Sequence, residues 1–185
     1  GKTPDGEDLP LGAAREFMAR DSDQPWCLVI ASNQPHTAWN RGDASAYPPD
    51  ELTVPAYLVD TPETRAGLSR YYAEITYMDG QVQQVMEMLE ELKQTENTAF
   101  LWLSEQGSQL PFGKWTCYDT GIHAAAVLRW PNVVKAGSES AALISYVDLV
   151  PTWIELAGGN PKPLDLDGAS FADVLKRKAK NHHTT

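Results

Sequence analysis

The sequence predicts an α/β fold, in which a mostly parallel sheet is sandwiched by helices. Two short apolar runs, residues 26–32 and 98–104, read as buried strands, because continuous apolar runs are typical of strands covered on both faces. A long amphipathic stretch lies between them, and a strand–helix–strand order favours a right-handed crossover and a parallel sheet. A third apolar run, residues 124–130, adds a further strand.

The stretch between the first two runs carries the strongest helix signals. Thr61 suits the N-cap, Pro62 suits the first helical position, and apolar residues then recur at helical spacing as far as about Lys93. Weaker periodicity predicts shorter helices at residues 9–20, 147–156 and 170–178. The polar stretch 33–62 contains five prolines, and loops of this length are usually functional or disordered.

Composition restricts the classes of partner. The 185-residue chain has a formal net charge of −10, which disfavours nucleic acid, because phosphate binding needs a basic surface. It has no apolar run of about 18 residues, so no membrane-spanning helix is expected. Its two cysteines permit at most one disulfide, and Cys27 is expected to be a buried strand residue.

The sequence predicts one domain over residues 1–179 and a disordered tail over residues 180–185. Chain ends are usually loose. This favours a free tail over a metal site for His182 and His183.

Residues that can carry chemistry follow the first two predicted strands. His36 follows the first strand, Glu105 and Gln106 follow the second, and Lys114 stands a few residues further on, between a glycine and a tryptophan. Ligands bind beyond the carboxyl ends of strands in open parallel sheets. Carboxylate and amide oxygens suit a hard cation, and an ammonium suits an anion. Each residue alone also fits an ordinary surface loop.

The order of several short segments is more specific. Ser-Glu-Gln-Gly at 104–107 is followed by Gly-Lys at 113–114, Tyr-Asp-Thr-Gly-Ile-His at 118–123 and Arg-Trp-Pro at 129–131. This series resembles the C-terminal metal and substrate segment of the formylglycine-dependent sulfatases. Three other segments are similar to parts of that family in the same order: residues 31–39, 147–152 and 166–171.

The resemblance implies an alkaline phosphatase-like fold and hydrolysis of a sulfate ester at a site that holds calcium. It implies that Lys114 and His36 act in catalysis and bind sulfate, that His123 binds substrate, and that Glu105 and Gln106 bind the metal. The expected partner is a sulfated small molecule or saccharide, and the expected location is periplasmic, extracellular or lysosomal. Neither nucleic acid nor a membrane is expected.

The sequence departs from the family pattern in three respects. Neither Cys27 nor Cys117 begins the Cys/Ser-x-Pro-x-Arg motif that becomes formylglycine, and the N-terminal Asp-Asp pair is also absent. The family's Ser-Asp-(His/Asn)-Gly appears as Ser-Glu-Gln-Gly, and His123 stands at the usual arginine. We therefore expect a fold truncated at its N-terminal side, inactive alone, with the missing N-terminal part as a possible partner.

Three alternatives stay open at this level. The first is a catalytically inactive sulfatase-fold protein or subunit that binds an anionic, sulfated ligand, which the Glu-Gln pair favours. The second is a phosphodiesterase of the same superfamily, which would need more histidine ligands than the four present. The third is an α/β binding module that matches by chance, which the ordered segments disfavour.

Overall fold

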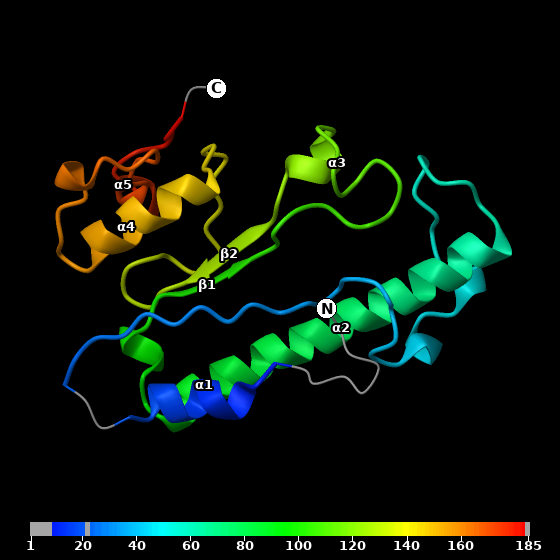
Figure 1. Cartoon of the computed structure of the whole chain (residues 1–185), viewed down its shortest axis with the longest axis horizontal. Helices are drawn as coiled ribbons and strands as arrows, with labels where there is room; N and C mark the ends of the chain where they lie inside the picture. Colours follow the sequence, from blue (N-terminus) through cyan, green and yellow to red (C-terminus); the bar gives the residue numbers. More distant parts are fainter. Residues whose placement is uncertain (1–8, 21–22, 184–185) are drawn as a thin grey trace. The chain divides into compact units, whose positions relative to one another are not determined.

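The computed structural model describes residues 9–20 and 23–183 (Figure 1). The chain divides into two compact units, residues 1–95 with 102–127 and residues 96–101 with 128–185. The elements in order are α1 (Leu11–Met18), η1 (Ala44–Ala46), η2 (Pro49–Glu51), α2 (Pro62–Glu91), η3 (Thr95–Asn97), β1 (Phe100–Leu103), α3 (Asp119–Ile122), β2 (Ala126–Arg129), η4 (Tyr146–Asp148), α4 (Leu149–Leu156), η5 (Lys162–Leu164) and α5 (Ala172–Leu175).

Helix α2 is the longest element of the first unit, as the sequence predicts. Its 30 residues extend about 45 Å at the α-helical rise. The Thr61 side chain accepts a hydrogen bond from the amide of Thr64 at 3.2 Å, which satisfies one of the donors that a helix start leaves unpaired. The predicted apolar face is buried at Leu68, Val85 and Leu89.

The long polar stretch before α2 folds against that helix. Arg65 of α2 donates to both carboxylate oxygens of Asp60, at 2.6 and 2.7 Å. The same guanidinium donates to the carbonyls of Pro49 and Leu52. Glu74, which is fully buried, accepts hydrogen bonds from two backbone amides of the stretch, those of residues 40 and 41.

The prediction that residues 26–32 form a sheet strand is wrong. Residues 26–32 are extended, but within the described residues the only sheet consists of β1 and β2, so this run has no ladder partner. Its residues alternate between exposed and half-buried, and Cys27 is exposed rather than buried as predicted. The run contacts α2 at its end, where Ser32 Oγ donates to Gln81 at 3.2 Å. The predicted crossover between residues 26–32 and β1 is therefore not formed here, because a strand needs a neighbouring backbone to pair with.

The other two predicted strands are present, in shorter form. β1 and β2 form a two-stranded sheet. Just beyond β1, the Ser104 amide donates to the Ala125 carbonyl at 3.0 Å, and the Ala125 amide donates to Ser104 Oγ at 2.8 Å. This pairing fixes where the loop between the two strands starts and ends.

The second unit is organised around α4. This helix contacts η4 and the short helix α5. Thr152 of α4 is fully buried; its hydroxyl donates to the Asp148 carbonyl at 2.6 Å and accepts from the Phe171 amide at 3.0 Å. A Cβ at Gly168 would lie 2.0 Å from the Val147 carbonyl oxygen, so only glycine permits this close approach of the two segments.

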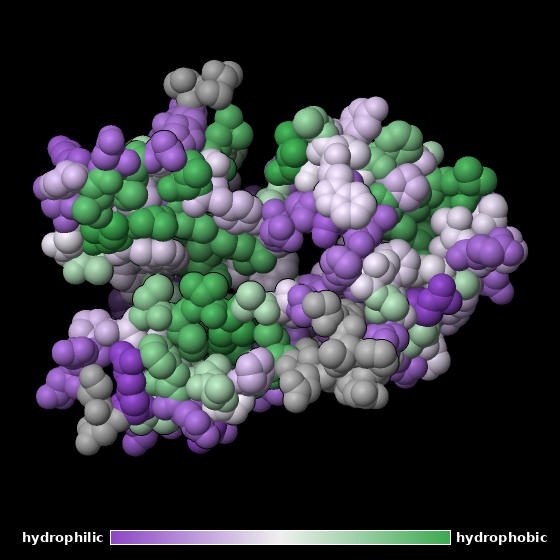
Figure 2. Space-filling model, viewed as in Figure 1, coloured by the Kyte–Doolittle hydropathy of each residue, from purple (hydrophilic) through white to green (hydrophobic). Residues whose placement is uncertain are grey.

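Apolar side chains are exposed in both units (Figure 2). Val29 is 84% exposed and Trp115 is 86% exposed. Large exposed apolar surface often marks a place where further protein or a ligand binds. Among the described helices, none combines the length and the apolar character that crossing a bilayer requires.

Candidate functional site

The loop between β1 and β2 is folded tightly on itself and carries four of the five predicted site residues. The Gly107 amide donates to the Gly121 carbonyl at 3.0 Å, and the Lys114 amide donates to the Ser108 carbonyl at 2.6 Å. A Cβ at Gly107 would lie 1.8 Å from the Thr120 carbonyl oxygen, so a side chain there would force the backbone apart. The segments 104–107, 113–114 and 118–123 thus converge through their backbones.

Phe112 stabilises the same loop through its carbonyl and its ring. Its carbonyl accepts hydrogen bonds from the hydroxyls of Thr116 and Thr120, at 3.0 and 2.5 Å. Its ring makes edge contacts with Tyr118 and Tyr57, at centroid distances of 5.5 and 6.3 Å. These contacts limit the freedom of the loop that presents Lys114.

His36 lies in a second loop that is tied to the first one. Its Nδ1 is 2.7 Å from the Thr37 carbonyl, and the Thr37 amide donates to Gln109 Oε1 at 2.5 Å. Gln109 is one residue from Ser108, whose carbonyl binds the Lys114 amide. The segments that carry His36 and Lys114 are therefore joined through residues 108–109.

Helix α2 supports both loops through Tyr71. The Tyr71 ring packs against Trp39 at a centroid distance of 5.2 Å. Burial raises the pKa of the Tyr71 hydroxyl, and this effect outweighs a hydrogen bond with Ser108, which acts to lower it. The phenol therefore stays neutral at ordinary pH and acts as a hydrogen-bonding link between α2 and the loop.

Lys114 supplies a cation that an anion can approach. The side chain is half-buried, and its Nζ lies 5.5 Å from the centroid of the exposed Trp115 ring. An ammonium near an aromatic face is attracted electrostatically to the ring. This arrangement presents a positive group on a tightly folded loop.

The remaining predicted residues have different surroundings. The exposed His123 Nδ1 is 3.4 Å from Asp119 Oδ2, across one turn of α3. Glu105 is exposed and Gln106 is half-buried. Their carboxylate and amide oxygens match the donors that calcium prefers, but calcium takes six to eight oxygens, so the two residues fit as part of a shell.

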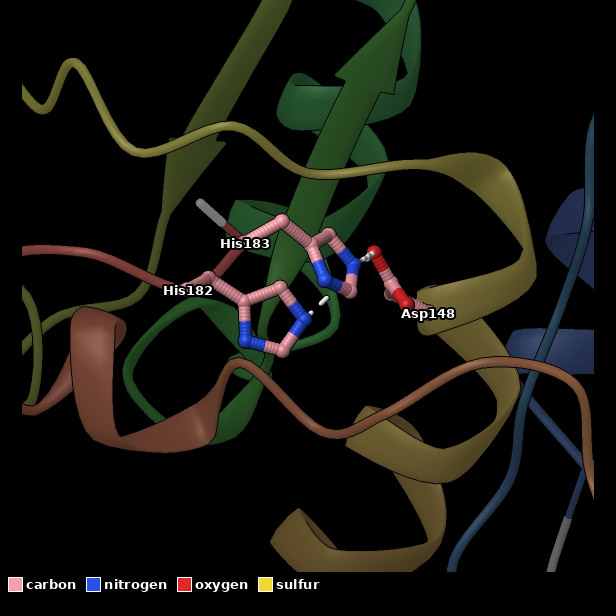
Figure 3. A group of neighbouring side chains, drawn as sticks. All are labelled: Asp148, His182 and His183. Atoms are coloured by element: carbon pink, nitrogen blue, oxygen red, sulfur yellow. Dashed lines mark hydrogen bonds and ion pairs between the residues drawn. The ribbon is translucent and has the colours of Figure 1, made fainter. Parts of the chain in front are cut away.

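A second cluster surrounds Asp148 in the second unit (Figure 3). The carboxylate is fully buried; its Oδ2 accepts from the Ser145 amide at 2.7 Å and its Oδ1 accepts from the Ala169 amide at 2.9 Å. His183 Nε2 lies 2.8 Å from Oδ2, and His182 Nε2 lies 3.4 Å from the same oxygen. Burial acts to raise the pKa of Asp148, but the two amides and His183 together outweigh it, and the pKa is lowered.

The sequence predicts that His182 and His183 lie in a loose tail that begins at residue 180. Of that tail, Thr184 and Thr185 lie outside the described residues, whereas both histidines pack against Asp148. The segment 147–152 was visible as a motif, but nothing local connects it to histidines more than thirty residues away. Gln109 and Tyr71 were also missed, because neither belongs to a motif and their roles depend on tertiary contacts.

Comparisons with known proteins agree with this architecture. A family model described as Sulfatase matches residues 10–159. The ulvan-active sulfatase of Formosa agariphila is 33% identical over 178 residues, covering 92% of this chain and 33% of that protein. The crystal structure of a putative sulfatase from Bacteroides fragilis is similar at a TM-score of 0.76 and 26% identity, over 91% of this chain and 41% of that chain.

A second solved structure, of Ps i-CgsB in complex with k-i-k-neocarrahexaose, is similar at a TM-score of 0.69 and 22% identity. It covers 89% of this chain and 38% of that chain, and at this identity the likeness shows the fold alone. The chain spans a third or less of the length of the first curated relatives it matches, between 20% and 33%.

The fold and its neighbours define the class as an α/β fold of the alkaline phosphatase type. The family model covers most of the chain, and a relative above 30% identity covers nearly all of it. The chain belongs to the sulfatase family.

Proposed function

We propose that this chain carries the C-terminal part of a sulfate ester hydrolase site, in which Lys114 and His36 contact the sulfate group. Membership of the sulfatase family supports the reaction class. The observation that carries the assignment is the hydrogen bond from the Thr37 amide to Gln109, which joins the His36 loop to the Lys114 loop.

The proposed roles follow from charge and position. The Lys114 ammonium binds the sulfate oxygens and stabilises the negative charge that develops on them during hydrolysis. His36 contacts sulfate or assists the leaving oxygen. His123, in the adjoining turn, contacts the substrate. Hydrogen bonds and ring contacts hold the loop between β1 and β2 in place before substrate binds. Little binding energy is therefore lost in ordering this loop.

Glu105 and Gln106 are proposed to contribute oxygen ligands to a calcium ion. Bound there, calcium would offset the negative charge of the sulfate group. Both arms are one methylene longer than the Asp and Asn ligands of the family pattern, so the ion would need a slightly displaced position. Neither Cys27 nor Cys117 is in the motif that forms the family's nucleophile, so this chain's residues bind and orient sulfate.

The proposed substrate class is a sulfated saccharide. The relative named as an ulvan-active sulfatase points that way. We also propose, by resemblance to the family, that the protein has a periplasmic, extracellular or lysosomal location.

Titration of the 185-residue chain with 4-nitrophenyl sulfate, followed by amide chemical shifts, tests the binding site. Saturable shifts are expected in the 33–39 and 104–123 loops. Lys114→Ala should weaken binding about tenfold or more, because a hydrogen bond to a charged group contributes about 1.5–3 kcal/mol. Lys162→Ala is the matched control, since it removes an exposed lysine of the second unit, and it should leave the affinity unchanged.

Two results would contradict the assignment. One is a set of shifts outside those loops, and the other is an affinity that Lys114→Ala does not change. We expect no hydrolysis of the aryl sulfate by the 185-residue chain, because it carries no nucleophile motif. Turnover that survives Lys114→Ala would refute the role of that residue. Sulfate binding with no calcium affinity would instead favour the catalytically inactive alternative.

A further inference from the structure

We propose that Asp148, His182 and His183 form a binding site for a divalent transition metal, for which zinc is the best-fitting ion. One ligand atom from each residue lies within 4.8 Å of the other two (Figure 3). The two imidazole nitrogens lie 3.4 and 2.8 Å from Asp148 Oδ2. Donors around a tetrahedral zinc ion are about 3.3 Å apart, given bonds of about 2.0–2.2 Å. Small side-chain rotations therefore suffice to admit the ion.

His182 gives an independent indication of a ligand. Its side chain is only 9% exposed, and its Nε2 is buried without a hydrogen-bond partner although it faces the Asp148 carboxylate. Buried polar atoms in folded proteins are nearly always paired. A metal ion between Nε2 and the carboxylate would use the nitrogen lone pair.

The surroundings of Asp148 hold the carboxylate ready for a cation. The amides of Ser145 and Ala169 donate one hydrogen bond to each carboxylate oxygen, which fixes its orientation. Such supporting hydrogen bonds are typical around metal ligands. Asp148 is buried, whereas the side chain of His183 is 39% exposed, so solvent reaches the cluster.

The donor set distinguishes this site from the proposed calcium position. Two imidazoles and one carboxylate suit zinc and its neighbours, whereas calcium takes oxygen ligands. Three protein ligands leave a fourth position for water or another ligand. The cluster belongs to the second unit, and Lys114 and Glu105 belong to the first. The inference therefore does not depend on the proposed sulfate site.

Cobalt(II) is the probe that tests the site, because its visible absorption reports tetrahedral coordination. The 185-residue chain, freed of metal by a chelator, is titrated with Co²⁺ in a Cys27→Ser/Cys117→Ser background, since both thiols are exposed and would bind the ion themselves. We expect saturation at one equivalent, a tetrahedral spectrum, and displacement of Co²⁺ by Zn²⁺.

Histidine variants then locate the ion. His182→Ala and His183→Ala should each raise the Kd for Zn²⁺ at least about tenfold, and should abolish the rise in Tm that Zn²⁺ causes. The chain's other two histidines provide the control: His36→Ala/His123→Ala should bind Zn²⁺ as the parent does. Far-UV circular dichroism checks that each variant is folded.

Absence of saturable Co²⁺ binding would overturn the proposal, as would a Kd that neither His182→Ala nor His183→Ala changes. Loss of binding in His36→Ala/His123→Ala would place the ion elsewhere and would also overturn it.

Discussion

Gly107→Ala is expected to destabilise the loop that carries the candidate sulfate site. The new Cβ would lie 1.8 Å from the Thr120 carbonyl oxygen, about half the 3.4 Å at which ordinary contact begins. The obstacle is backbone, and it cannot rotate away as a flexible side chain would. The hydrogen bond from the Gly107 amide to the Gly121 carbonyl must then lengthen or break. Overpacking of this kind costs about 1–3 kcal/mol.

Gly80→Ala is the matched control, because it adds the same methyl group where there is space. A Cβ at Gly80 would have nothing within 4 Å, and the residue lies inside α2. Alanine favours a helix interior over glycine by about 0.5–1 kcal/mol. The two variants should therefore differ in free energy of unfolding by about 1.5–4 kcal/mol, with opposite signs relative to the parent.

Thermal unfolding followed by far-UV circular dichroism measures the difference. For a chain of this length, each 1 kcal/mol moves Tm by about 2–4 °C, so the two variants should melt about 3–16 °C apart. Urea unfolding should give the same order of stability. Equal Tm values for Gly107→Ala and Gly80→Ala would refute the close approach of residues 107 and 120.

The other predictions concern the two units separately. Thr61→Ala should lower the free energy of unfolding measured in urea by about 1 kcal/mol, because α2 loses its N-cap; an unchanged value would contradict the cap. Glu74→Ala should cost about 3 kcal/mol in the same assay, because two backbone amides lose the buried carboxylate that accepts their hydrogen bonds, and Glu74→Gln should cost less; equal losses would contradict that reason. The pKa of Asp148 is lowered in the folded protein, so its contribution to stability is present above the unfolded value of 3.8 and is lost as pH falls below it. In chelator-treated samples, Asp148→Asn should therefore show a smaller loss of stability between neutral and acid pH than the parent, and identical pH profiles would contradict the assignment.

Much of the local structure follows from the sequence, for reasons visible in particular residues. Thr61 and Pro62 indicate the start of α2, and the apolar stripe to Leu89 follows the helical period. Both features can be predicted from the sequence because capping and amphipathicity are local properties. The motif order from residue 104 to residue 131 was enough to indicate the family. Glycines such as Gly107 were part of that pattern because close backbone contacts tolerate no other residue.

The tertiary structure decided what depends on distant partners. An apolar run such as residues 26–32 becomes a sheet strand only if another backbone pairs with it, and no local pattern in the run records whether one does. The link from Thr37 to Gln109 spans 72 residues, and the contact from Asp148 to His183 spans 35. Hydrophobic periodicity and capping act within a few turns of the chain, so the sequence determined α1, α2, α4, α5 and the family, whereas only the folded chain determined which loops and which histidines meet.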